Sequence, residues 1–245
     1  MYGLMIVTGI AAANLFAVRL LRSASWINAD KFILLEAYGF LGGAVGAKLL
    51  YLMVSFDSID WPRLGDIVYL SSLMSSGFVF YGGLIGALLA LFAGCHFEKI
   101  SLKKYLGTFI FMIPMMHGFG RIGCFCAGCC YGIPYSGAFS VVFPEGSFAP
   151  SGIQLFPVQL LEAVLLIILS LCLYAAALRS KCRYSFAAYL IVYAVLRFFL
   201  EYLRYDEARG YLWIFSTSQW ISLFLTAAGV IVFIRAYHAG DQIIN

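Results

Sequence analysis

One short stretch carries most of the side chains suited to chemistry, and it centres on an arginine. Arg121 lies within His117–Gly132, which is rich in glycine and cysteine and follows the apolar run Tyr105–Met116. A charged side chain at the edge of a bilayer is costly, and such residues are usually functional. The nearby glycines let backbone or ligand approach closely. We interpret Arg121 as a fixed cation facing a buried anion, and the commonest anion in a membrane is a lipid phosphate.

A second charged group consists of Arg197, Glu201 and Arg204, at spacings of four and three residues. These spacings predict that all three lie on one face of a helix, where Arg–Glu pairs form. The ordinary interpretation is an interfacial salt-bridge cluster. The functional interpretation is a second cationic group that faces Arg121 across a binding site. Two arginines bind a phosphate diester through paired N–H donors, a geometry that lysine does not match.

Three further side chains each keep two interpretations. His117, four residues before Arg121, is either a general base, with an unperturbed pKa of about 6.5, or a packed supporting group. Glu162 lies in an apolar segment and needs a partner. It either forms a structural pair with Lys48 or an arginine, or it orients the catalytic arginine. Tyr81 is either an interfacial aromatic beside a glycine-rich helix-packing face or a hydroxyl that points at the reacting lipid.

Seven cysteines are many for a chain of 245 residues, and four of them are clustered in sequence. The four are Cys124, Cys126, Cys129 and Cys130. Cys126-x-x-Cys129 alone is a weak redox or metal signal, and no second ligand cluster completes a zinc site, so we expect no metal. A disulfide forms there if that side of the membrane is oxidising. Otherwise these are small packed thiols near the site.

The composition predicts a polytopic membrane protein. Of the residues, 63% are hydrophobic and 11% are charged, against about 25% charged in soluble domains, and the mean hydropathy is +0.92. With about 20 apolar residues needed for each crossing, the length allows roughly six to eight spans. The net charge of +4 is modest, and we find no basic, aromatic-interleaved surface for nucleic acid. The first apolar segment lacks a charged start and a cleavage site, and we interpret it as a span.

We therefore predict an all-α fold with about seven transmembrane helices in one domain over residues 1–245. The spans cover roughly residues 2–21, 32–55, 77–95, 105–124, 157–178, 184–203 and 211–234. Ile67–Ser76 is too short to cross and favours a half-helix or a re-entrant piece. Residues 133–156 form the longest polar connection, an extracytoplasmic loop whose glycines and prolines favour loop or short strands.

The distribution of lysine and arginine predicts the orientation. The larger group falls on one side: Arg19, Arg22, Lys31, Lys99, Lys103, Lys104, Arg179, Lys181, Arg183 and Arg235. The smaller group is Arg63, Arg121, Arg197, Arg204 and Arg209. Since positive loops face the cytoplasm, the N-terminus lies outside and the C-terminus inside. Arg121 and the loop then lie at the outer leaflet.

Taken in order, these motifs resemble the prolipoprotein diacylglyceryl transferase family of bacterial inner-membrane enzymes. The most specific is the string His117–Gly123, His-Gly-x-Gly-Arg-Ile-Gly. The others are individually weak but occur in the family's order: Tyr2–Met5, Gly42–Lys48, Gly82–Gly86, Pro157-x-Gln159-Leu160-x-Glu162, Arg197-x-x-x-Glu201-x-x-Arg204 and Ser216-x-x-Gln219.

The resemblance implies a reaction in which diacylglyceryl passes from phosphatidylglycerol to the lipobox cysteine thiol of a preprolipoprotein signal peptide. Glycerol 1-phosphate is released, and no metal or nucleotide cofactor takes part. The partners are then membrane lipid and the signal peptide, with no nucleic acid. The expected catalytic residues are Arg121, Arg197, His117 and Tyr81. The expected substrate-binding residues are Tyr2, Lys48, Gly82, Gly83, Cys124, Gly132, Glu162, Glu201 and Arg204.

The chain departs from the family pattern at several of these positions. The family usually has histidine where Tyr81 stands and asparagine where Cys124 stands. Further departures are Lys48 for arginine, Cys129 for an acidic residue and Phe156 for histidine. Tyrosine, with a pKa of about 10, is a poor base at neutral pH. Either His117 takes the role, or the base is not essential, or the chain is a paralogue that uses another nucleophile or lipid.

Two other classes stay open on the sequence. One is a paralogue without this activity that acts as a lipid-binding or thiol- and metal-binding membrane protein, based on the cysteine cluster. The other, weaker, is a small transporter, against which the lack of a clear repeat counts.

Overall fold

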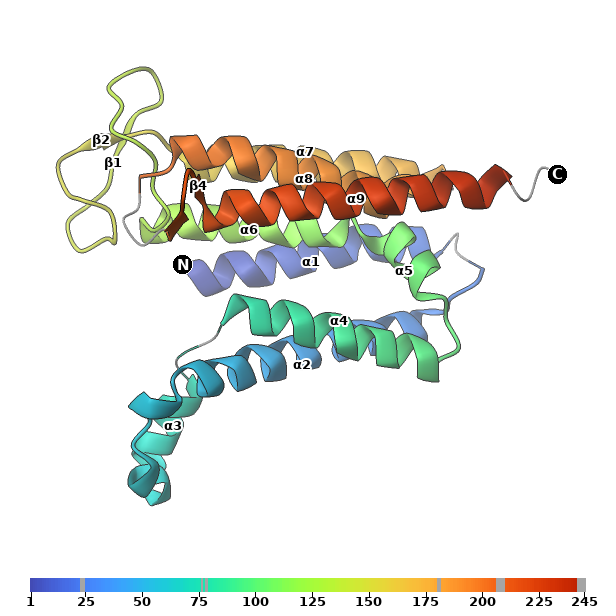
Figure 1. Ribbon diagram of the computed structural model, residues 1–245, viewed down its shortest axis with the longest axis horizontal. Coiled ribbons are helices and arrows are strands. Elements are labelled where there is room, and N and C mark those ends of the chain that lie inside the picture. The colour runs from blue at the N-terminus through green and yellow to red at the C-terminus, as the bar shows by residue number, and fades with distance from the viewer. Residues whose placement is uncertain (23–24, 76, 78, 180–181, 206–209, 242–245) are drawn as a thin grey trace. The chain divides into compact units, whose positions relative to one another are not determined.

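The computed structural model describes residues 1–22, 25–75, 77, 79–179, 182–205 and 210–241, and the chain divides into two compact units (Figure 1). Unit 1 consists of Met1–Arg22 and Lys104–Asn245, and unit 2 is Ser23–Lys103. Each unit is described by itself. Lys181 and Arg209, which we used to predict the orientation, lie outside the described residues. The expectation of one domain over residues 1–245 stays a prediction.

Unit 1 is a bundle in which helices far apart in sequence lie side by side. Its long helices are α1 (Tyr2–Leu21), α6 (Met112–Ala127), α7 (Val158–Leu178), α8 (Ser185–Leu200) and α9 (Thr217–Asp241). Helix α6 packs against α1 and α7, and α8 packs against α7 and α9. Helices α1, α7 and α9 run in one direction and α6 and α8 in the other (Figure 1). The C-terminal ends of α6 and α8 therefore lie at the same end of the unit.

The span expected over residues 105–124 is not one straight helix. It consists of α5 (Leu102–Phe109) and α6, which are bent by 47° at a short break. Pro114 explains the break, because proline has no backbone N–H and its ring clashes with the carbonyl four residues earlier, that of Ile110. Ile110 O instead accepts a hydrogen bond from Ile113 N at 3.2 Å.

The last span begins later than expected. Residues 211–216 form the hairpin of β3 (Tyr211–Leu212) and β4 (Phe215–Ser216), and α9 starts at Thr217. A capping box sets this start. Gln219 N donates to Ser216 Oγ at 3.2 Å, and Ser216 N donates to Gln219 Oε1 at 3.0 Å. These two bonds satisfy backbone N–H groups at the start of the helix, so the sequence Ser-x-x-Gln marks where α9 begins. The apolar residues before Ser216 made the predicted span begin too early.

The long polar connection of residues 133–156 contains short strands, as expected. Strand β1 (Val141–Val142) pairs antiparallel with β2 (Gln154–Leu155). Phe143, Ala149 and Leu155 form a small hydrophobic core under this connection. A single bridge joins Gly132 to Arg204, just beyond the 3-10 turn η4 (Glu201–Leu203).

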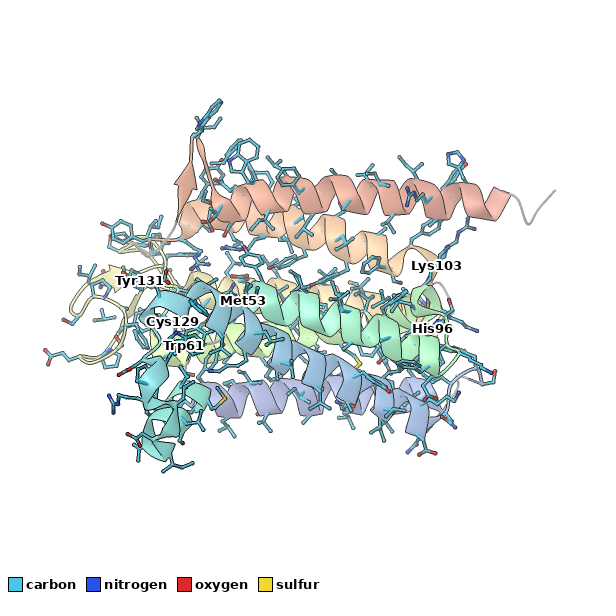
Figure 2. All side chains as sticks on the ribbon, turned by 60° about the horizontal axis from the view of Figure 1, so that its bottom comes forward. Met53, Trp61, His96, Lys103, Cys129 and Tyr131 are labelled. Atoms are coloured by element: carbon cyan, nitrogen blue, oxygen red, sulfur yellow. The ribbon has the colours of Figure 1, made fainter. Side chains whose placement is uncertain are left out.

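Unit 2 is a helical hairpin of α2 (Ala29–Val54) and α4 (Phe80–Phe97), with the short helix α3 (Ile67–Ser75) between them. Two 3-10 turns, η1 (Phe56–Ser58) and η2 (Trp61–Gly65), precede α3, which matches the expected half-helix. Figure 2 shows Met53 and Trp61 at one end of the hairpin and His96 and Lys103 at the other. Helices α2 and α4 therefore run antiparallel.

The fold confirms the all-α, multi-pass prediction. Within the described residues, five helices are long and apolar enough to cross a membrane, namely α1, α2, α7, the segment Cys182–Leu203 and α9 as far as His238, and the bent pair α5–α6 makes six. The seventh expected span corresponds to α4, whose segment Tyr81–Phe97 is apolar but shorter. The expected number of seven spans therefore rests on counting α4, which is about 27 Å long at about 1.5 Å per residue.

Glycines let α2 and α4 approach within backbone contact. A Cβ placed on Gly46 would contact Gly82 O and lie 2.8 Å from Gly86 Cα. A Cβ on Gly43, one turn away on the same helix, would lie 3.6 Å from both Ala87 Cβ and Gly83 O, an ordinary contact. Small residues at such crossings are typical of membrane helix pairs, whose association relies on close packing.

We predict that Gly46→Ala destabilises unit 2 while Gly43→Ala does not. The added methyl of Gly46→Ala meets backbone that has no flexible side chain to yield, and such overpacking costs about 1–3 kcal/mol. The midpoint of thermal unfolding of the purified protein in detergent, measured by circular dichroism, checks this. Equal midpoints for the two variants would contradict the close crossing.

Candidate active site

A buried ion pair joins α6 to α7. Arg121 Nε lies 3.1 Å from Glu162 Oε2, and the side chains are 14% and 4% exposed. His117 Nε2 lies 3.9 Å from the other oxygen, Oε1. Because α6 is continuous from Met112 to Ala127, His117 and Arg121 share one face and meet the same carboxylate. Of the partners considered for Glu162, the structure places an arginine there.

Two small residues let α6 pack tightly on both sides. A Cβ on Gly118 would lie 2.9 Å from Ile167 Cγ1 and 3.2 Å from Ala163 O on α7. A Cβ on Gly123 would lie 2.9 Å from the ring of Tyr2 on α1. These close approaches bring the Arg121 guanidinium within reach of a carboxylate whose own backbone belongs to another helix.

The second arginine has its own carboxylate. Arg197 Nη2 lies 2.8 Å from Glu201 Oε2 and donates to Ser218 Oγ, on α9, at 3.0 Å. The Arg197 side chain is 11% exposed, and the Glu201 side chain is 3% exposed. The other terminal nitrogen of Arg197, Nη1, is buried and has no hydrogen-bond partner among the described residues. A buried guanidinium N–H without a partner is costly, which favours an acceptor supplied from outside the chain.

The two pairs border one small pocket. Glu162 and Arg197 line it together with Tyr193 and four leucines. The His117 ring packs edge-on against Tyr193, with centroids 5.5 Å apart, and lies within electrostatic range of both arginines. The structure thus brings together Arg121, Arg197, His117 and the carboxylates Glu162 and Glu201.

Arg204 is not on the helix face that we predicted for it. Helix α8 ends at Leu200, η4 follows, and Arg204 has extended backbone with φ −93° and ψ 149°. The Arg197–Glu201 pair forms as expected, but Arg204 pairs instead with Gly132 across a single bridge. A Cβ on Gly132 would contact Phe156 O and lie 2.9 Å from Leu203 O, so only glycine fits this crossing. Both residues tie the end of α8 to the loop.

Tyr2 and three cysteines lie on the other side of Arg121. The Tyr2 side chain lies within electrostatic range of Arg121 and of the thiols of Cys124, Cys129 and Cys130. None of the seven cysteines, all of which lie in the described part of the chain, forms a disulfide. Figure 2 shows Cys129 at the end of unit 1 where α6 leads into the loop. Burial, together with the neighbouring Cys130, raises the pKa of the Cys129 thiol.

Unit 2 holds four of the expected site residues. The Lys48 ammonium donates to Leu73 O and, at 3.4 Å, to Gly77 O, and it lies 4.8 Å from the centre of the Tyr51 ring. Gly82 and Gly83 face α2 at the glycine crossing, and Tyr81 is half exposed. Lys48 therefore holds the end of α3 in place. The substrate roles of these four residues stay predictions.

Sequence reasoning missed three residues around the arginines. Tyr193 is four residues before Arg197, so the helical period alone would have placed it on the same face. Ser218 follows the capping box, which is a detectable helix start. Gln159 is 1% exposed, and its Nε2 donates to Cys129 O at 2.9 Å, linking α7 to the loop. Only the approach of α9 to α8, which no local pattern encodes, brings Ser218 to Arg197.

We predict that Glu162→Gln destabilises the protein by about 3–5 kcal/mol, because it leaves the Arg121 guanidinium buried without its counter-charge. The matched change Glu145→Gln removes the same charge from an exposed position in the same unit and leaves stability unchanged. Chemical unfolding of both variants in detergent measures the difference. If both variants unfold at the wild-type midpoint, the ion pair contributes nothing to stability.

Comparison with known proteins agrees with this geometry. The model of the prolipoprotein diacylglyceryl transferase family matches residues 1–235. The phosphatidylglycerol–prolipoprotein diacylglyceryl transferase of Clostridium tetani is 36% identical over 234 residues, covering 95% of this chain and 91% of its own length. Transferase 2 of Clostridium perfringens is 31% identical, covering 95% and 89%. The transferase of Idiomarina loihiensis is 29% identical, covering 96% and 87%. Because these matches span nearly the whole chain, it belongs to the prolipoprotein diacylglyceryl transferase family.

Proposed function

We propose that this chain transfers the diacylglyceryl group of phosphatidylglycerol to the lipobox cysteine in the signal peptide of a prolipoprotein. Family membership and the names of its relatives support this assignment. The protein acts as a single domain of the bacterial inner membrane, with its N-terminus outside and its C-terminus in the cytoplasm. In unit 1, Arg22 and Arg179 follow the C-terminal ends of α1 and α7, and Arg235 lies in the C-terminal part of α9. These ends lie opposite the end where α6 and α8 terminate, which supports this orientation (Figure 1).

One observation carries the proposal: two guanidinium groups from α6 and α8 are each paired with a buried carboxylate, and both lie within electrostatic range of His117. The four side chains Arg121, Arg197, Glu162 and Glu201 sum to no net charge. An anion is therefore bound by directed N–H groups more than by excess charge. Arg197 Nη1 is such a group, and the ion pair of Arg121 is made through Nε.

The chemistry follows from this arrangement. The thiolate of the acceptor attacks the carbon of the diacylglycerol unit that is bonded to the phosphate oxygen. The bond between this carbon and that oxygen breaks, and glycerol 1-phosphate leaves. Negative charge grows on the leaving phosphate, where preorganised donors stabilise it most. His117 is the proposed acceptor of the thiol proton in unit 1, and Tyr81 is proposed to contact the lipid. The proposed substrate-binding residues are Tyr2, Lys48, Gly82, Gly83, Cys124, Gly132, Glu162, Glu201 and Arg204.

We expect Arg121→Lys to lose at least about a hundredfold in turnover, almost as much as Arg121→Ala. Removing one donor that stabilises a developing charge costs about a hundredfold or more, and an ammonium does not reproduce the guanidinium fork. Arg179→Ala, at the exposed opposite end of α7, is the matched control with full activity. Wild-type turnover in Arg121→Lys would show that a positive charge at this position is sufficient for catalysis, without the geometry of a guanidinium.

The decisive measurement is glycerol phosphate release from phosphatidylglycerol vesicles by the purified protein, given a peptide with a lipobox cysteine. The peptide should gain the mass of a diacylglyceryl group. A peptide with serine in place of cysteine should gain none, because the hydroxyl is a much weaker nucleophile than a thiolate. The Clostridium tetani relative serves as positive control. If the relative is active and this chain releases nothing, the proposed activity is wrong.

A further inference from the structure

Three thiols at the end of α6 converge on one point. The Sγ atoms of Cys124, Cys129 and Cys130 all lie within 4.8 Å of one another. Cys124 is 8% exposed, and the other two are partly buried. Cys126, which the sequence pattern paired with Cys129, is exposed and lies outside this trio. The three thiols that lie together therefore have the sequence spacing C-x4-C-C, whereas the C-x2-C pair of Cys126 and Cys129 does not come together.

The backbone is shaped to fold these thiols together. Helix α6 ends at Gly128, which has φ 73°, and Cys130 has φ 57°, so two left-handed residues bracket Cys129. Cys129 N donates to Cys124 O at 3.1 Å, which holds the turn that follows α6 against Cys124. A left-handed conformation costs a non-glycine residue about 1–2 kcal/mol. Such residues persist where the surroundings hold them, and they cluster at functional sites.

Neighbouring elements hold the turn in place. The buried Gln159 of α7 donates to Cys129 O at 2.9 Å. A Cβ on Gly128 would lie 2.8 Å from Ser147 Cβ, so the loop of residues 133–156 covers this turn closely. The trio is thus anchored from α6, α7 and the loop. This rigidity is what a preorganised ligand site requires.

The donor set selects one class of ligand. Three thiolates are soft ligands, which favour Zn²⁺ and similar thiophilic cations over Mg²⁺ or Ca²⁺. Tetrahedral coordination at about 2.3 Å places two sulfurs roughly 3.8 Å apart, so the trio needs to contract by at most about 1 Å. Arg121 lies within electrostatic range of Cys124 and Cys130.

We propose that Cys124, Cys129 and Cys130 bind one thiophilic divalent cation such as Zn²⁺, whose fourth coordination position takes the cysteine thiol of the acceptor peptide. This inference rests on the proposed function. Three protein ligands with one open position are the pattern of catalytic zinc, whereas structural sites use four. Tyr2 and Arg121 border the trio, so the coordinated sulfur lies on the same side of α6 as the cation that binds phosphate.

Coordination would remove the need for a strong base. A thiol bound to such a cation is deprotonated outright. The released proton passes to His117 and on to water. The bound sulfur then donates its electron pair to the glycerol carbon, the carbon–oxygen bond breaks, and its electrons leave with glycerol 1-phosphate. The product is a thioether, a weaker ligand than the thiolate, so it dissociates. The cation keeps its charge, and nothing is oxidised or reduced.

The test uses the full-length protein in detergent, stripped with a chelator under reducing conditions and titrated with Co²⁺ as a spectroscopic probe and with Zn²⁺. We expect one cation per chain and a thiolate-to-cobalt charge-transfer band. Cys124→Ser, Cys129→Ser and Cys130→Ser should each bind more than about tenfold more weakly, in line with the losses seen when metal sites are altered. Cys126→Ser is the matched control and should bind like the wild type.

Addition of the acceptor peptide separates this inference from the proposed function. The cysteine peptide should shift the cobalt spectrum, and the serine peptide should not. Full turnover in chelated protein that takes up no cation would overturn the inference while leaving the transferase assignment intact. A cobalt spectrum indifferent to the cysteine peptide would also overturn it. Peptide-dependent cobalt shifts without any glycerol phosphate release would instead contradict the transferase assignment.

Discussion

The ion pair between Arg121 and Glu162 is the interaction on which the site depends. Both groups are removed from water, and a charge in that position is stable only with its partner. The pair therefore fixes the guanidinium before any lipid arrives, so that little reorganisation remains for the reaction itself. It also links α6 to α7. The same contact serves the stability of the bundle and the placement of the cation.

The pair exists only because small residues let the helices approach. Gly118 faces α7 and Gly123 faces α1, so α6 packs closely on both sides while its charged face stays between them. In a bilayer, association of helices relies on van der Waals contact and polar contacts, since lipid is as apolar as leucine. Gly118 therefore affects the site, because it lets α6 and α7 come close enough for the ion pair to form. Without the close crossing at Gly118, the carboxylate and the guanidinium would be separated by a layer of side chains.

The sequence allowed correct prediction of the features that depend on composition and period. The apolar segments, the all-α class and an arginine as a partner of Glu162 follow from such patterns. The errors occur where a local signal competes with hydrophobicity. Pro114 breaks the expected fourth span, and the capping box at Ser216 delays the last helix. Arg204 was misplaced because the helical period was extended past the end of α8 at Leu200.

Other features could not have been predicted, because they depend on backbone conformation and on contacts between distant segments. Nothing in the sequence marks Cys130 as left-handed, yet that conformation decides which cysteines meet. The same turn places thiols beside Arg121, so the groups suited to a sulfur nucleophile and to a phosphate leaving group adjoin one another. The departures at Cys124 and Cys129 thereby acquire a common cause. With tyrosine where the family has histidine, the proposed coordination of the acceptor sulfur would reduce the need for a strong base, and the arginines that we propose to bind phosphate would keep that role.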